Sequence, residues 1–170
     1  MFSDLCDDYV DFGYKKSDRR YKSISKITIH HMAGNSNPIY CAEWHRDSDR
    51  DVSSNYYIGS DGSIVGGVSE DRRAWSTRDE DNDQSAINIE VANCSRGPEW
   101  RVSYEALVSL LALCIDICKR YNFRLNWTGD KYGSLTTHNM LVPTICPGPY
   151  LMKMMKDIAL NINKFLEEYK

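Results

Sequence analysis

The stretch that decides the fold is residues 85–92, Ser-Ala-Ile-Asn-Ile-Glu-Val-Ala. Apolar Ile87, Ile89 and Val91 alternate in it with polar residues, and a period of two is typical of a strand with one apolar and one polar face. A second β-rich segment, residues 26–30, ends in the histidine pair of the sequence His-His-Met-Ala-Gly at 30–34. Both segments therefore predict strands, the first with a polar face.

Helices and further strands surround these two segments. The other predicted elements are a helix that begins at Asn37-Pro38 and passes His45, strands at 54–59 and 63–68 joined by Asp61-Gly62, a helix over 103–121, and a final helix after Pro149. Asn as the cap with Pro in the first turn is typical of a helix start, and Asp-Gly is typical of a hairpin. Strands in the first half with helices interspersed and at the end predict an α/β fold, a central mixed β-sheet flanked by helices.

Length and composition predict one domain over residues 1–170. The chain is 42% hydrophobic and 26% charged, which is ordinary for a folded domain. Its net charge of -3 argues against a nucleic acid partner, because such proteins need a basic face. Apolar stretches stay far below the roughly 20 residues that span a bilayer, so no membrane partner is expected. The acidic start, unlike a signal peptide, predicts synthesis in a cytoplasm.

Histidine and cysteine are the residues that suggest a metal. The chain has four histidines, and His138 lies eight residues before Cys146. Joined to the distant histidine at the strand end, these two would form a Cys-His-His site. Three protein ligands leave the fourth tetrahedral position open, as in catalytic rather than structural zinc sites.

Five segments in a fixed order carry a resemblance to a known family. They are His-His-Met-Ala-Gly at 30–34, Ser-Ser-Asn-Tyr-Tyr-Ile at 53–58 before Asp61-Gly62, Arg-Ala-Trp at 73–75, Ile-Asn-Ile-Glu-Val at 87–91, and Thr-His at 137–138 with Cys-Pro-Gly at 146–148. From about residue 26 to residue 151 the chain resembles the N-acetylmuramoyl-L-alanine amidases that share their fold with animal peptidoglycan recognition proteins. It looks most like the endolysin catalytic domains of phages and prophages of Gram-positive anaerobes.

The resemblance implies a set of ligands and catalytic residues. His30, His138 and Cys146 match the family's ligands for Zn²⁺. Geometry agrees that one histidine of the 30–31 pair serves, since neighbours in a strand point to opposite faces. Glu90 matches the catalytic glutamate of one branch of the family, and Thr144 matches a position near the scissile carbonyl where relatives carry Lys or Thr.

Substrate contacts are expected from Trp75, Asn55 and His31. Trp75 is a candidate for the core as much as for the groove, and His31 is expected to pack or hydrogen-bond beside the metal ligand. Two departures from the family are visible. Ser54 stands where many members have a metal-facing tyrosine, and Ser76 stands where relatives often have histidine.

Other reactive residues are expected to be structural. Cys114 and Cys118 lie on the apolar stripe of the 103–121 helix and are expected in the core. The remaining cysteines outside the metal site receive the same interpretation: Cys6, Cys41 and Cys94. His45 is expected to be structural, with a place in the substrate groove as the alternative, and the run from Arg78 to Asp83 is expected to be a solvated loop.

The function that the resemblance implies is hydrolysis of the amide between N-acetylmuramic acid and L-alanine in peptidoglycan. Two alternatives remain: a peptidoglycan-binding module without activity, and an amidase for soluble muropeptides of wall recycling. The partner is peptidoglycan, the expected state is a monomer, and the expected site of action is the cell wall after release from the cytoplasm. The chain ends after its last helix, so we expect no wall-binding module in it.

Overall fold

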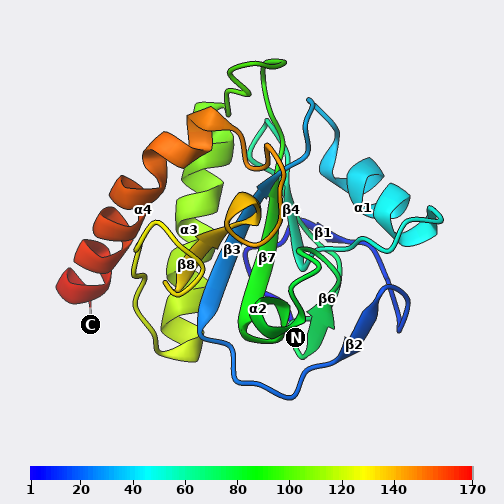
Figure 1. Cartoon of the computed structure of the whole chain (residues 1–170), viewed down its shortest axis with the longest axis horizontal. Coiled ribbons are helices and arrows are strands. Elements are labelled where there is room, and N and C mark those ends of the chain that lie inside the picture. Colours follow the sequence, from blue (N-terminus) through cyan, green and yellow to red (C-terminus); the bar gives the residue numbers. More distant parts are fainter. Residues whose placement is uncertain (170) are drawn as a thin grey trace.

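Six strands form a mixed sheet at the centre of the protein, in the order β1-β5-β4-β7-β3-β8 (Figure 1). The structure is a computed structural model that describes residues 1–169. The strands of this sheet are β1 (Asp8–Tyr9), β3 (Lys26–His31), β4 (Tyr56–Ile58), β5 (Ile64–Gly66), β7 (Ala86–Val91) and β8 (Leu135–Thr137). Strands β4 and β5 are antiparallel, and the other neighbours run parallel. A separate antiparallel pair joins β2 (Ser17–Arg19) to β6 (Arg72–Ala74).

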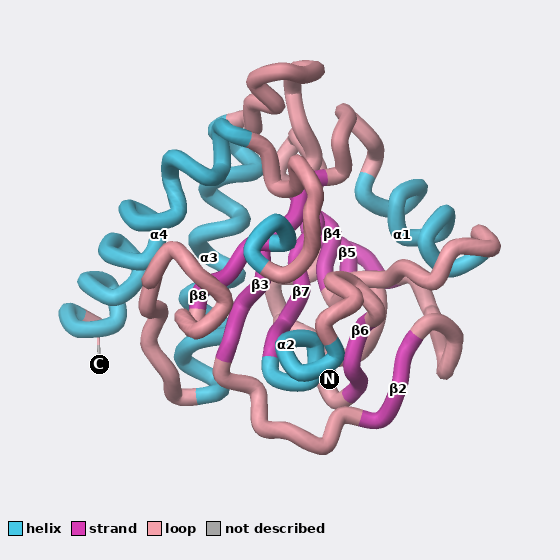
Figure 2. The backbone as a smooth tube through the Cα atoms, viewed as in Figure 1, coloured by secondary structure: helices cyan, strands magenta, loops and turns pink. Residues whose placement is uncertain are grey.

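Helices cover both faces of this sheet, which confirms the predicted fold class. They are α1 (Pro38–Asp47), α2 (Glu80–Ser85), α3 (Tyr104–Tyr121), the 3-10 turn η1 (His138–Met140) and α4 (Pro149–Glu168). The long helices α3 and α4 pack against each other and lie side by side in Figure 2. Within residues 1–169, no helix combines the length and the apolar character that crossing a membrane requires.

Strand register separates an apolar face of the sheet from a polar one. Partners in parallel strands point to the same side, and Ile29 pairs with Ile89 whereas His30 pairs with Glu90. The isoleucines belong to the larger core, which includes Leu110 and Leu113 of α3 and the buried residues of α4. The histidine and the glutamate therefore share the opposite face, above which α1 and α2 lie.

Local signals explain where the predicted elements begin. The side chain of Asn37 accepts hydrogen bonds from the main-chain N–H groups of Ile39 and Tyr40, which confirms it as the cap of α1. Ser103 caps α3 in the same way. The hairpin at Asp61-Gly62 is confirmed as β4 and β5.

Two expectations for polar and sulfur residues are corrected. The run from Arg78 to Asp83 is not a solvated loop, because its second half forms α2 and buries Asn82 and Asp83 in a polar network. The charges of this run suggested that it is exposed to solvent, but hydrogen bonds from neighbouring groups stabilise the side chains of Asn82 and Asp83 in the interior. Cys94 is exposed rather than packed in the core, whereas Cys114 and Cys118 are buried as expected.

Candidate metal centre

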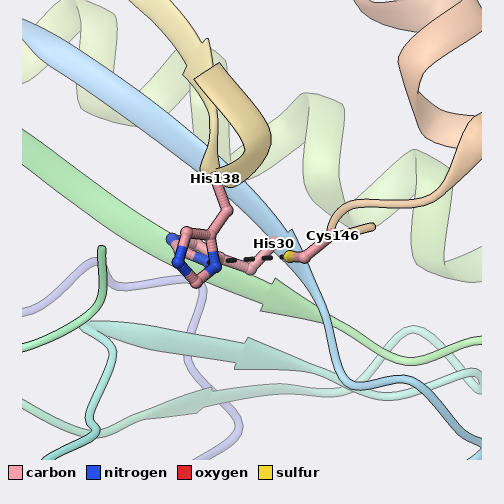
Figure 3. Close-up of side chains that lie close together, drawn as sticks. All are labelled: His30, His138 and Cys146. Atoms are coloured by element: carbon pink, nitrogen blue, oxygen red, sulfur yellow. Dashed lines mark hydrogen bonds between the residues drawn. The ribbon is translucent and has the colours of Figure 1, made fainter. Parts of the chain in front are cut away.

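Three side chains with metal-binding atoms meet at the carboxyl ends of adjacent parallel strands. His30 lies near the end of β3, and His138 directly follows β8, which pairs with β3. Cys146 lies in the loop before α4, and Figure 3 shows its sulfur pointing toward the two imidazoles. Side chains from two distant parts of the chain, the end of β3 and the 138–146 segment, thus converge.

Their donor atoms are spaced as zinc ligands are. Nδ1 of His30 is 3.2 Å from Nδ1 of His138 and 3.8 Å from Sγ of Cys146, and all three donors lie within 4.8 Å of one another. Zinc binds nitrogen at roughly 2.0–2.1 Å and sulfur at about 2.3 Å, so donors of a tetrahedral site are about 3.3–3.8 Å apart. The two histidines and the cysteine therefore fit a zinc ion in their chemistry, and the two distances from His30 are close to the spacing of a tetrahedral site.

Burial keeps the imidazoles in the form that binds a metal. Burial and the nearby ring of His138 lower the pKa of His30 to about 3, and burial also lowers the pKa of His138. Both rings are thus neutral with a free lone pair at neutral pH. Burial raises the pKa of the Cys146 thiol, although the main-chain N–H of His31 donates to its sulfur at 3.3 Å. A bound cation is what would favour the thiolate here.

Glu90 stands beside this cluster on the polar face. It is the register partner of His30 on one side and of Tyr57 on the other. Only 8% of its surface is exposed, and burial raises its pKa to about 8. Its Oε2 is buried without a hydrogen-bond partner among the described residues. A carboxylate oxygen without a protein partner is available to a group that enters the site.

An open cavity of about 980 Å³ leads to the cluster. His138 and Thr144 line it on one side, and Trp44, His45 and Arg78 contribute to the rest of its wall. The hydroxyl oxygen of Thr144 accepts a hydrogen bond of 3.3 Å from the main-chain N–H of Cys146, while the residue itself is exposed. Thr144 thus lines the cavity from the same loop that carries Cys146.

The three residues expected to bind substrate are not brought together at this cavity. Trp75 is half-buried, and its indole N–H donates to Asp18 at 2.7 Å, while the next residue, Ser76, lines the cavity instead. His31 is buried on the side of β3 opposite to His30, and its ring meets Trp100 edge to face. The structure therefore supports packing for His31, one of its two expected roles.

Asn55 differs from the expectation more clearly. It is fully buried, its amide donates to the main-chain oxygen of Val68 at 2.9 Å, and its oxygen accepts from the main-chain N–H of Asn88 at 3.0 Å. Because both polar groups of the side chain bind the main chain, Asn55 connects neighbouring segments of the sheet region. The sequence motif could not show that both polar groups of this side chain already bind the main chain.

Sequence reasoning missed several residues of the cavity. Trp44 and His45 come from α1, and Nδ1 of His45 lies 2.9 Å from the hydroxyl of Tyr57. Arg78 reaches the cavity from a left-handed backbone position, φ 62°. A cavity-facing tryptophan on an amphipathic helix gives no sequence signal that distinguishes it from core, whereas His45 was at least an open alternative.

Fold and cluster together define an α/β protein with a two-histidine, one-cysteine donor set at the carboxyl edge of its sheet. Comparison with protein families finds that residues 20–149 match the profile described as N-acetylmuramoyl-L-alanine amidase. This match covers most of the chain. The protein therefore belongs to the N-acetylmuramoyl-L-alanine amidase family.

Solved structures with the same fold include amidases of phage and bacterial type. The endolysin N-acetylmuramoyl-L-alanine amidase LysCS from Clostridium intestinale is 21% identical, with a TM-score of 0.66 over 95% of this chain and 99% of that one. The catalytic domain of XlyA is 14% identical, with a TM-score of 0.70 over 91% and 98% of the two chains. AmpD is 18% identical, with a TM-score of 0.70 over 93% and 96%. At these identities the similarity establishes a shared fold. A comparison with curated protein sequences finds no significant match.

Proposed function

We propose that the protein is a zinc-dependent amidase that hydrolyses the amide between N-acetylmuramic acid and L-alanine in peptidoglycan. Membership of the amidase family supports the activity. The observation that carries the zinc-dependent mechanism is the cluster of His30, His138 and Cys146, with the unpartnered Oε2 of Glu90 on the same face of the sheet. The proposal treats residues 1–170 as one catalytic domain.

His30, His138 and Cys146 would hold the zinc ion. When bound, zinc supplies Lewis acidity, which polarises a carbonyl oxygen and makes water more acidic. His138, one of these three residues, also lines the open cavity together with Thr144. A closed structural site would need a fourth protein ligand, and the cluster of the described residues contains three.

Glu90 would act as the general base and then as the general acid. A bound cation nearby would favour its ionised form, and the carboxylate would then take one proton from the water that adds to the carbonyl carbon of the lactyl group. The same proton then passes to the alanine nitrogen as the carbon–nitrogen bond breaks, so that the products are a free lactyl carboxyl and a free amine. The buried position of Glu90 keeps bulk water from competing for this proton transfer.

Thr144 would assist from the loop that carries Cys146. Its oxygen accepts from the main chain, which leaves its hydroxyl proton free to donate to the oxygen of the scissile carbonyl. One neutral hydroxyl is a weak stabiliser of a developing oxyanion compared with a pair of aligned main-chain donors. We therefore assign Thr144 a minor share of the rate enhancement.

The experiment that tests this function is digestion of purified sacculi followed by mass spectrometry of the products. Release of intact stem peptides that begin with L-alanine, dependent on zinc, is the expected result. Cleavage restricted to small soluble muropeptides would instead support a role in wall recycling, and retention on walls without products would support a binding module. An endolysin-like enzyme of this kind would act on the wall after release from the cell.

A further inference from the structure

A chain of buried hydrogen bonds connects the metal centre to α2. Nε2 of His30, the ring nitrogen that faces away from the other two ligands, lies 3.0 Å from Oδ1 of Asn88. The amide nitrogen of Asn88 in turn donates to Oδ1 of Asp83 at 3.2 Å. All three residues are at most 1% exposed. Asp83 belongs to the acidic run whose charge pattern suggested a solvated loop.

The carboxylate of Asp83 is held as a hydrogen-bond acceptor. The main-chain N–H groups of Ser76 and Thr77 donate to its Oδ2 at 3.3 and 3.0 Å, and the Thr77 hydroxyl donates to its Oδ1 at 2.8 Å. Main-chain N–H groups only donate, so Oδ2 is fixed as an acceptor, and an ionised carboxylate accepts at Oδ1 as well. The position of Asp83 is fixed as well, because the guanidinium of Arg20 donates to its main-chain oxygen at 2.9 Å.

This anchor determines the orientation of the Asn88 amide. An acceptor at Asp83 requires that the NH₂ group of Asn88 points toward it, since the reversed amide would place two acceptor oxygens against each other. The Oδ1 of Asn88 must then face His30. An acceptor at this place keeps the proton of His30 on Nε2 and the lone pair on Nδ1, the atom that lies 3.2 Å from the His138 ring.

We propose that Asp83 and Asn88 are positioning residues of the metal centre. Asp83 orients the Asn88 amide, and Asn88 holds the His30 ring in the tautomer and rotation that present Nδ1 to the metal. The inference rests on the proposed zinc site but not on the reaction there. Partners that orient a metal-bound histidine typically contribute about 10- to 100-fold in metal affinity or activity.

Zinc affinity, measured by competition between the protein and a chromogenic chelator, tests the proposal. Asn88→Ala is expected to weaken zinc binding about 10- to 100-fold, and Asp83→Asn is expected to weaken it in the same direction. If Asp83 acts through Asn88, the double variant binds zinc no more weakly than Asn88→Ala alone. Equal affinity of Asn88→Ala and wild type, or losses that multiply in the double variant, would overturn the proposal.

Thr136→Val is the matched control. Its hydroxyl lies 2.8 Å from that of Thr28, which accepts from Asn82 of α2, so this second buried chain also runs from the sheet to α2. The hydrogen bonds of this second chain involve none of the three proposed metal ligands. Zinc affinity should therefore stay at the wild-type value in Thr136→Val, and a loss equal to that of Asn88→Ala would assign the effect to general disturbance of the polar layer.

A measurement on the wild-type protein keeps the proposal testable if the variants do not fold. In the zinc-loaded protein, long-range proton–nitrogen spectra should show His30 with a slowly exchanging proton on Nε2 and the metal on Nδ1. A proton on Nδ1 with the metal on Nε2 would contradict the proposed relay. Neither readout needs wall hydrolysis, so a protein that binds zinc but does not cut peptidoglycan would fail the proposed function without failing this inference.

Discussion

The two faces of the central sheet are built from alternate residues of the same strands, yet they serve opposite purposes. On one face, Ile29 and Ile89 pack against α3 and α4 in the main core. On the other face, His30 and Glu90 are also buried but carry polar groups. Apolar burial stabilises the fold at roughly 25 cal/mol per Å², whereas polar burial costs free energy unless hydrogen bonds replace water. The apolar face thus stabilises the fold, and the polar face carries the groups that are proposed to bind the metal and to transfer protons.

The polar face itself divides into satisfied and unsatisfied groups. Thr28 and Asn88 have hydrogen-bond partners inside the protein, so they contribute structure and orientation. Glu90 lacks a partner for Oε2 among the described residues, and Nδ1 of His30 faces only other metal-binding atoms. A ligand can supply the missing partner to a polar group that has none within the folded protein.

Removal of the metal should have the largest effect on activity, and this effect should arise from the polar face of the sheet alone. Cys146→Ser and His138→Ala are expected to lose zinc and to reduce wall hydrolysis below detection, because a missing donor leaves two of the three ligands. A chelator should abolish activity in the wild type, and added zinc should restore it. Elemental analysis and a wall-clearing assay check both results. Full activity in chelator, with no metal in the purified protein, would contradict the mechanism.

Glu90→Gln should separate chemistry from metal binding on the same face. Glutamine keeps the size of the side chain but removes the proton acceptor, and general-base catalysis is typically worth about 10²- to 10⁴-fold. Hydrolysis should therefore fall by that factor while zinc content stays near one ion per chain. Rates of product release and elemental analysis of the same samples measure the two quantities.

The outcome for zinc decides what Glu90 is. Loss of zinc in Glu90→Gln would make the residue a ligand or the positioning residue of one. Near-normal hydrolysis would remove it from the mechanism and direct attention to Thr144. Either result would contradict the assignment of metal binding to one set of residues and of proton transfer to another.

Much of this arrangement could be predicted from the sequence, and the reason lies in periodicity. Alternation in residues 85–92 separates Ile89 from Glu90 without any structure, and the cap at Asn37 marks where a helix begins. The ligands were reached through a family resemblance, since eight residues between His138 and Cys146 constrain little by themselves. Periodicity and sequence motifs indicate secondary structure and the order of the elements along the chain, and these features were predicted correctly.

The missed parts depend on which polar groups find each other in space. Asp83 and Asn55 were assigned to solvent and to substrate, but both are buried and bound to neighbouring main-chain groups. Hydrogen bonds between residues far apart in sequence leave no periodic signal. Two tryptophans illustrate the same limit. Only the fold shows that Trp44 of α1 lines the cavity, whereas Trp75 donates a hydrogen bond to Asp18 instead.

A substitution on the apolar face should affect stability alone. Leu113 of α3 is fully buried in the main core, and Leu113→Ala is expected to lower the free energy of unfolding by about 2–5 kcal/mol. Zinc affinity of the folded variant should be unchanged, because this side chain packs on the opposite side of the sheet. Chemical denaturation and the chelator competition assay measure the two effects.

Val108→Ala is the control for this comparison. Val108 lies on the same helix but is 46% exposed, so its truncation should change the unfolding free energy by no more than about 0.5 kcal/mol. A weaker zinc site in Leu113→Ala under conditions where the protein is fully folded would show that the two faces are coupled. Their roles would then be less separate than the register of the strands indicates.

The smallest effect is expected at Thr144, at the rim of the cavity. Thr144→Val keeps the shape of the side chain and removes the hydroxyl that is free to donate toward the scissile carbonyl. A single neutral hydrogen bond contributes about 0.5–1.5 kcal/mol, so loss of the donor should lower kcat roughly 2- to 13-fold. The same substitution removes the acceptor for the main-chain N–H of Cys146, so zinc content is measured on the same samples and is expected to stay near one ion per chain. Thr144→Ser retains the hydroxyl and should keep wild-type kcat, which distinguishes the donor from the methyl group. A loss in Thr144→Val as large as that of Glu90→Gln would mean that the hydroxyl, rather than the metal centre, carries most of the charge that develops on the carbonyl oxygen.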